Sequence, residues 1–346
     1  MNLKEQVFFF KRLAFLSNAH MPLVESLEVL RKQTRRKRHV QIFDSILSDI
    51  REGQTLSRAF GKYPAVFSAL CVSVVQVGES SGSLSLALEH LAGELKKKQI
   101  LRAKMVGAFI YPAVVTCATL GITVFLMLFL FPKITPIFKS LHAHLPLSTR
   151  IVMASSTFLM YWGVLVFAVG AALLIAIFLT YKRSVSARLC GDTLALRLPL
   201  VGTMLQLYTL SNTSRTLGTL LSSGMSLSHA LEATTNTTSN LVYKGEFKKL
   251  QRVVAHGERL SSYLEQRPAL FPYTLSHMVA VGERSGTLSQ TLLYVAEQYD
   301  AEVDEITKNI STLIEPLLMV CMGVLVGFIA VSIITPIYAI TQNLHT

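Results

Sequence analysis

The chain contains three long stretches that are apolar and almost free of charge. Residues 106–131 and 151–181 carry no charged side chain, and residues 313–340 carry only Glu315. About 20 apolar residues let a helix cross a bilayer, and a helix satisfies its own backbone hydrogen bonds inside lipid. The stretches therefore predict three transmembrane helices, at 105–131, 151–181 and 313–340.

The charges that flank these stretches predict their orientation. Basic side chains precede the first stretch and follow the second, namely Lys96, Lys97, Lys98, Arg102, Lys104, Lys182, Arg183 and Arg188. The cytoplasmic ends of membrane helices are enriched in Lys and Arg. We therefore expect residues 1–104 and 182–312 in the cytoplasm, which is a multi-pass arrangement with a cytoplasmic N-terminus. The short loop 132–150 and the tail 341–346 are expected outside it.

An internal repeat runs through most of the chain at a constant offset of 204 residues. It pairs Met21 with Met225, Leu27 with Leu231, Gly53 with Gly257, Pro64 with Pro268, Val77 with Val281 and Leu88 with Leu292. The same register continues into the apolar stretches, where Pro112 pairs with Pro316 and Cys117 with Cys321. The repeating unit is therefore a cytoplasmic module plus the span that follows it, and the second span is an unpaired return crossing. Since both copies share one orientation, we expect a pseudo-twofold axis along the membrane normal.

Each module is predicted to be a bundle of about six helices. Residues 3–16 are amphipathic, and Leu23, Leu27 and Leu30 recur at helical spacing. Ser83 begins a long helix that we expect to continue into the first span. No alternating strand pattern with hairpin signals accompanies these segments. The predicted fold class is an all-α membrane protein with two homologous cytoplasmic six-helix bundles and three transmembrane helices.

Both modules contain a Gly-Glu-x-Ser-Gly motif. It lacks the lysine and the preceding strand of a phosphate loop, and it lacks the residue order of a hydrolase nucleophile turn. We expect a helix–helix turn whose glycines adopt positive φ, with Ser and Glu side chains bound to free backbone groups at the helix ends. The residues of the two motifs are Gly78, Glu79, Ser81, Gly82, Gly282, Glu283, Ser285 and Gly286. A motif present in both copies argues against a unique catalytic centre, and no enzymatic activity is predicted.

Prolines mark the ends of the first and third apolar stretches, at Pro112, Pro132, Pro316 and Pro336. Because proline lacks a backbone N–H, we expect kinks or helix ends there. Glu315 lies beside Pro316. An intramembrane carboxylate raises the idea of ion coupling, but in the first turn of a span it can stay near the headgroups and favour the positive helix end. We favour this anchoring role.

The net charge of +12 is concentrated in the first module, where Arg35, Arg36, Lys37 and Arg38 form a basic cluster that the second module lacks. Two interpretations stay open: a solvated loop near anionic lipid and a docking patch for an acidic partner. No basic helix with interleaved aromatic residues indicates nucleic acid. The four cysteines form no CxxC pair and the histidines no metal-ligand pair, so no cofactor or metal is predicted.

Taken together, several segments resemble the type II secretion F protein / type IV pilus PilC family of inner-membrane platform proteins. They are Met21-Pro22-Leu23, Gly53-x-x-Leu56-Ser57, Pro64-x-x-Phe67, Val77-Gly78-Glu79, Tyr111-Pro112, Phe131-Pro132-Lys133, Leu145-Pro146, Leu198-Pro199-Leu200, Glu315-Pro316 and Thr335-Pro336. The first module begins at the start of the chain, as in the short forms of competence or dedicated pilus systems.

The resemblance implies a scaffold in the cell inner membrane for building a pilus, or a secretion or competence pseudopilus. Implied partners are a cytoplasmic assembly ATPase, pilin or pseudopilin subunits, other inner-membrane assembly proteins, membrane lipid and further copies of the chain, as a homodimer or higher homo-oligomer. Some secretion members bind a divalent metal through carboxylates one helical turn apart. The matching positions here are near Glu89 and Gly93, and Gly93 offers no ligand. The alternative function is a subunit of an oligomeric transporter or channel, which the proline-broken spans and Glu315 motivate.

Overall fold

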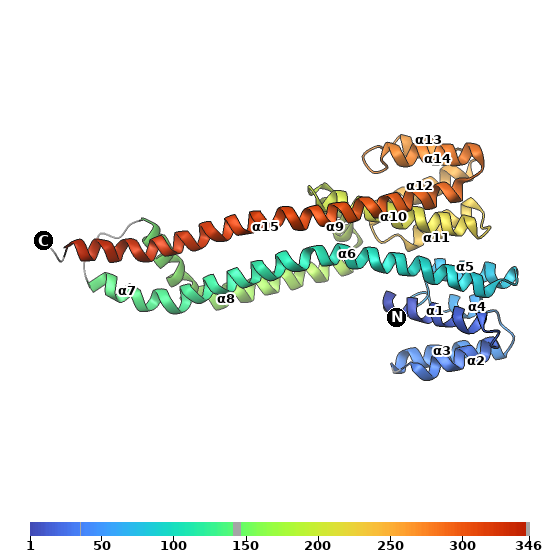
Figure 1. Ribbon diagram of the computed structural model, residues 1–346, viewed down its shortest axis with the longest axis horizontal. Helices are drawn as coiled ribbons and strands as arrows, with labels where there is room; N and C mark the ends of the chain where they lie inside the picture. Colours follow the sequence, from blue (N-terminus) through green and yellow to red (C-terminus); the bar gives the residue numbers. More distant parts are fainter. Residues whose placement is uncertain (35, 141–146, 344–346) are drawn as a thin grey trace. The chain divides into compact units, whose positions relative to one another are not determined.

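The computed structural model describes residues 1–34, 36–140 and 147–343, and every regular element among them is a helix (Figure 1). These residues form two compact units. The first comprises Met1–Met105 and Leu189–Ile306, and the second comprises Val106–Arg188 and Thr307–Thr346. The all-α fold class is confirmed.

The first unit contains two copies of a six-helix module. Module 1 consists of α1 (Leu3–Asn18), α2 (Leu23–Gln33), α3 (Lys37–Arg51), α4 (Leu56–Gly61), α5 (Ala69–Ser80) and the first part of α6 (Leu84–Phe125). After α9 (Val185–Arg197), module 2 consists of α10 (Val201–Ser222), α11 (Leu227–Thr237), α12 (Leu241–Ala255), α13 (Leu260–Glu265), α14 (Tyr273–Ser285) and the first part of α15 (Leu288–Asn343). Helices α11, α12 and α13 begin and end 204 residues after α2, α3 and α4. The sequence repeat is therefore also a repeat of helix boundaries.

Aromatic side chains fill the centre of module 1. The rings of Phe60 and Phe67 stack with their centroids 4.0 Å apart, and Phe9 lies within 6.0 Å of both. Large rings bury much apolar area per residue and dominate core energetics. The equivalents of Phe60 and Phe67 in module 2 are Leu264 and Phe271, which are also buried. The two modules therefore share a core position by position while differing in the side chains that fill it.

The four glycines of the two motifs have two different roles. Gly82 and Gly286 have φ of +68° and +70°, a backbone conformation that favours glycine. Gly78 and Gly282 instead lie in the last turn of α5 and α14. A Cβ on Gly78 would lie 2.5 Å from the Ala87 Cβ. The expectation that all four glycines serve positive φ was wrong, because one glycine of each pair is required by the close approach of two helices.

The second unit holds the apolar parts of the chain. Among the described residues, three helices are long and apolar enough to cross a membrane, within Leu84–Pro136, Leu147–Tyr181 and Leu288–Thr335. Their large apolar side chains are mostly exposed, as with Val164 and Phe167, which is the pattern of a surface that faces lipid. Both α6 and α15 are unbroken helices that carry a module into its span (Figure 1). The chain is a membrane protein.

The segment predicted as the outer loop is partly helical. A π-helix, η1 (Leu126–Leu130), leads directly into α7 (Phe131–Ser140), and α8 begins at Leu147 and ends at Arg183. The remaining residues of this loop, 141–146, lie outside the described residues. In the predicted tail, α15 continues to Asn343, and residues 344–346 lie outside the described residues.

The prolines do not end the helices in which they lie. Pro112 is inside α6, and both Pro316 and Pro336 are inside α15. A proline leaves unpaired the carbonyl four residues earlier, which for Pro336 is that of Ser332. The Thr149 hydroxyl of α8 donates a hydrogen bond to this carbonyl at 2.9 Å.

A second hydroxyl of α8 donates a hydrogen bond to the other repeat span. Ser156 donates to the carbonyl of Met127 at 2.5 Å, within η1 and just before Pro132. Thr149 and Ser156 are seven residues apart and so lie on one face of α8. In lipid every backbone polar group needs a protein partner, so the unpaired span α8 satisfies carbonyls near a proline in both repeat spans.

We predict that Gly282→Ala destabilises the protein by about 1–3 kcal/mol, because overpacking at a helix contact forces the backbone apart. Its Cβ would lie 2.8 Å from Thr291 Oγ1 and 3.0 Å from Leu288 Cα. The matched control is Gly245→Ala in α12, where the added Cβ meets nothing within 4 Å. That change should raise stability by about 0.4–1 kcal/mol. Thermal unfolding of the detergent-solubilised variants measures both, and equal shifts would contradict the close-approach role.

Candidate functional surfaces

The two modules of the first unit meet through their long helices. Lys97 of α6 pairs with Glu297 of α15 at 3.0 Å, and Lys104 pairs with Asp304. Both partners advance by seven residues from one pair to the next, so α6 and α15 run parallel here with coiled-coil spacing. Helix α5 also packs against α10 and α11. Module 1 thus presents α5 and α6 to module 2, which receives them with α10, α11 and α15.

A buried arginine lies at the centre of this contact. Arg215 is 4% exposed and pairs with Glu94 of module 1 at 3.3 Å and with Asp300 of its own module. The Ser211 hydroxyl also donates to Asp300. Burial raises the pKa of the Asp300 carboxyl above its usual value, despite Ser211 and Arg215. When the pKa of a carboxyl is higher in the folded than in the unfolded state, the group stabilises the fold only at pH values below its unfolded-state pKa. This contribution is lost as the pH rises through the folded-state pKa. At neutral pH this cluster therefore fixes the register of the contact more than it adds net stability.

The two copies do not use equivalent surfaces in this contact. Thr219 of α10 is fully buried, whereas its repeat equivalent in α1, Phe15, is 72% exposed. Arg215 is buried, whereas its equivalent, Lys11, is exposed. A twofold axis would place equivalent residues on both sides of the contact. The predicted pseudo-twofold relation was therefore wrong for the modules, because α10 carries the small polar side chains that permit close packing and α1 does not.

The glutamate of each motif caps a different helix from the one in which it lies. Glu79 of α5 accepts hydrogen bonds from the backbone N–H groups of Leu56 and Ser57, at 2.5 and 3.0 Å, at the start of α4. Glu283 does the same for Leu260 and Ser261 at the start of α13. A carboxylate at a helix N-terminus is favoured by the orphan N–H groups and the helix dipole.

The serines of the motifs act at the other end of the same helices. Ser81 Oγ donates to the Val77 carbonyl at 2.8 Å, and Ser285 Oγ donates to the Val281 carbonyl at 2.9 Å. Each motif thereby closes the end of α5 or α14 and ties it to a helix more than 20 residues earlier. Every side chain of the motif has a structural partner, and the arrangement resembles no nucleophile–base pair.

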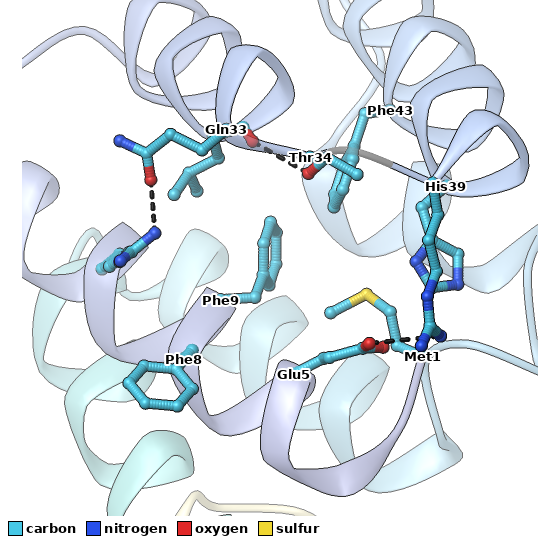
Figure 2. A pocket seen from close by; sticks show the side chains of 11 residues that line it. Met1, Glu5, Phe8, Phe9, Gln33, Thr34, His39 and Phe43 are labelled. Carbon is cyan, nitrogen blue, oxygen red and sulfur yellow. Dashed lines mark hydrogen bonds and ion pairs between the residues drawn. The ribbon is translucent and has the colours of Figure 1, made fainter.

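The basic cluster borders a pocket of about 410 Å³ at the ends of α1 and α3 (Figure 2). Arg36 forms an ion pair with Glu5 at 3.2 Å beside Met1 and His39. The Asn2 backbone N–H, and then Arg36, hold the pKa of Glu5 below its usual value. Lys37 and Arg38 are exposed at the start of α3, and Arg35 lies outside the described residues. Within the cluster, Arg36 has a structural role and the other two described cations face solvent.

Glu315 is exposed in α15, one residue before Pro316 in the unbroken helix. Tyr111 occupies the equivalent position in α6 and is also exposed. Glu315 is the single acidic residue of the stretch 313–340, so this stretch has no series of carboxylates. Across the residues that the structure describes, no three His, Cys, Asp or Glu side chains gather where they could hold a metal ion.

The buried network of Arg215, Glu94 and Asp300 was not foreseen from the sequence. Arg215 is the single charged residue of α10, and an isolated charge on a helix of 22 residues is a signal of a buried pair. Equivalent positions of the two repeats also carry charges of opposite sign, since Lys96 of α6 corresponds to Asp300 of α15. This difference indicates that the last helices of the two modules carry complementary charges.

Comparison with known proteins places the chain in a family. The profile of the type II secretion system protein F family matches residues 9–132 and 213–336, again 204 residues apart. The chain is 34% identical to the type IV pilus assembly protein PilC of Thermus thermophilus over 342 residues, which cover 99% of this chain and 84% of that protein. It is 31% identical to the type II secretion system protein F of Vibrio cholerae over 327 residues, covering 94% and 80%. The chain belongs to the type II secretion system protein F family.

We predict that Arg215→Met lowers the stability of the protein by about 3 kcal/mol or more, because Glu94 and Asp300 lose their buried cation. Arg31→Met is the control. The Arg31 side chain is 42% exposed and pairs with the 48% exposed Asp44 within module 1, so the loss should be much smaller. Thermal unfolding measures both effects. A small effect of Arg215→Met would show that the network is not needed to hold the modules together.

Proposed function

We propose that the protein is an inner-membrane platform on which a type IV pilus or a secretion or competence pseudopilus is assembled. It would couple a cytoplasmic assembly ATPase to the extraction and polymerisation of pilin-like subunits. The observation that carries the proposal is the match over nearly the whole chain to relatives named as type IV pilus assembly proteins and type II secretion system protein F. The repeated family match includes each module together with its span.

The continuity of α6 and α15 suggests how such a platform works. Each helix begins at a module and continues without a break into an apolar span. A displacement or rotation of a module can pass along a rigid helix of this kind. The ion pairs between Lys97 and Glu297 and between Lys104 and Asp304 join the two helices, so the two spans would receive a common motion. The protein itself would be a scaffold and not a catalyst.

The flanking charges support a specific placement of the chain in the membrane. In this proposal residues 1–104 and 182–312 face the cytoplasm, where an ATPase could reach them, and the segment 132–150 and the C-terminus face the other side. Glu315 would anchor the third span at headgroup level. The exposed Lys37 and Arg38 would then bind an acidic surface of a cytoplasmic partner.

Deletion of the gene should abolish surface fibres or pseudopilus-dependent secretion while the fibre-subunit level persists, because a platform acts after subunit synthesis. Immunoblots of sheared fibres and of whole cells measure the two quantities. Complementation with the Glu315→Gln variant should restore assembly, since an anchor does not need to change protonation state. Fibres formed without the protein would refute the platform, and a defect confined to Glu315→Gln would favour an ion-coupled transporter.

The basic cluster gives a second test. Lys37→Glu with Arg38→Glu should reduce assembly about tenfold or more if the patch docks an acidic partner, because the contact becomes repulsive. Arg36 stays unchanged in this variant to preserve its pair with Glu5. The control reverses two cations of α12 in module 2, Lys244 and Lys248, and should leave assembly intact. Normal assembly in the first variant would favour a merely solvated segment.

A further inference from the structure

Module 1 carries an open groove with an unusual lining. Helices α1 and α6 line this groove of about 710 Å³. Phe8 and Phe15 are 52% and 72% exposed on it and alternate with Lys4 and Lys11 along α1. These four positions share one helix face. Two exposed phenylalanines on one face of a helical bundle indicate a surface that a partner covers.

The equivalent groove of module 2 is already filled, by module 1 of the same chain. Its lining includes Asn212, Arg215 and Thr219, the repeat equivalents of Phe8, Lys11 and Phe15. Arg215 and Thr219 are buried there, and Glu94 of α6 reaches Arg215. The fold therefore shows what this kind of groove accepts, namely the face formed by the fifth and sixth helices of another module.

The equivalent face of module 2, formed by α14 and α15, is exposed. Tyr273, His277 and Val281 form one stripe along α14, and Tyr273 and Val281 are 74% and 39% exposed. Their equivalents in α5 are Ala69, Ser73 and Val77, which are partly buried. The chain therefore has one joined groove and face, and one open groove and open face of the same kind.

The groove charges are reversed between the two sites. In the filled groove α15 supplies Glu297, Asp300 and Asp304, whereas the open groove has Gly93, Lys96 and Ile100 at these positions. The filled groove is therefore acidic along its sixth helix. The open groove is basic, with Lys4, Lys11 and Lys96 all exposed.

The α5–α6 face of module 1 and the α14–α15 face of module 2 also differ in charge, with the opposite sign change. Module 1 presents Lys97, Lys98 and Leu101, and module 2 has Ala301, Glu302 and Glu305 at these positions. Burial and the neighbouring Glu305 raise the pKa of Glu302, a repulsion that an opposing lysine would relieve. A basic groove thus matches an acidic face and repels the basic face of module 1, which gives the contact its specificity.

We propose that the α1–α6 groove of one chain receives the α14–α15 face of a second copy of the same chain. This contact repeats between chains the one that joins the two modules within a chain. Such a heterologous contact generates either a ring or an open filament. The inference specifies the homo-oligomer of the proposed function, but it can be tested without any fibre.

The first experiment removes the apolar anchors. Phe8→Ser with Phe15→Ser should weaken self-association of the full chain in detergent about tenfold or more, as for central aromatic anchors. The control is Leu86→Ser, which changes an equally exposed residue of α6 outside the groove. Light scattering over a dilution series gives the association constant. The melting temperature of the variants should not fall, since both phenylalanines are exposed in the single chain. Unchanged self-association in the double variant would overturn the proposal.

The second experiment exchanges the charges. One variant carries Lys11→Glu and Lys96→Glu, and the other carries Glu302→Lys and Glu305→Lys. Each alone should lose self-association about tenfold or more, because groove and face then have like charges. A mixture of the two, carrying different affinity tags, should recover it as a hetero-oligomer, because both junctions are again complementary. Failure of the mixture to associate, or wild-type association of either variant alone, would overturn the assignment.

The third experiment maps the register. The equivalents of Lys97 and Glu297 are Ala301 and Gly93. In a background without the native cysteines, one chain carrying Gly93→Cys and another carrying Ala301→Cys should be joined by a short bismaleimide. Lys97→Cys with Glu297→Cys in one chain is the positive control and should react within the chain. Cross-links only between two Gly93→Cys chains would indicate an isologous contact and refute the proposal. A monomeric chain whose groove variant loses binding to anionic vesicles would reassign the groove to lipid.

Discussion

The parallel packing of α6 against α15 is the contact on which the rest of the first unit depends. Each helix completes its own module and also meets the other module. The ion pairs of Lys97 and Lys104 set the register along this line, while Arg215 and Glu94 fix it laterally. Burial raises the pKa of the Asp300 carboxyl, so the removal of this group from water opposes its attraction to Arg215. A hydrophobic contact of two smooth helices could slide, whereas a buried arginine with two carboxylates tolerates one arrangement.

Duplication followed by divergence explains the asymmetry of the modules. The boundaries of α2, α3 and α4 recur in α11, α12 and α13, and the capping glutamates Glu79 and Glu283 are common to both copies, since each bundle needs them to fold. The surfaces have diverged instead. Helix α10 has small polar side chains that accept a neighbouring module, and α1 has exposed Phe8 and Phe15. An exposed apolar stripe is costly in water, so the difference between α1 and α10 concerns what each module binds and not how it folds.

The second unit is under a different constraint, because in lipid no water is available to its backbone polar groups. Prolines in both repeat spans remove N–H donors, and the unpaired span α8 supplies hydroxyls to nearby carbonyls. Thr149 donates a hydrogen bond to the carbonyl of Ser332, and Ser156 donates one to the carbonyl of Met127. Phe131, Val152 and Ile329 pack together beside them. The second span therefore does more than return the chain across the membrane, since its polar side chains make the proline-containing helices tolerable in lipid.

The sequence by itself determined the three apolar helices, the repeat of 204 residues and the six-helix count of each module, because apolar length and helical period are local properties of the chain. It also singled out the Gly-Glu-x-Ser-Gly motifs, but it assigned Gly78 to a turn. Only the tertiary structure showed that Gly78 meets Ala87 and that Glu79 caps a helix 23 residues earlier. The contact between the modules was likewise beyond the sequence. Repeats suggest symmetry, but the packing of α5 and α6 on α10, α11 and α15 depends on shape and charge between residues more than 100 positions apart, as in the pair of Glu94 and Arg215.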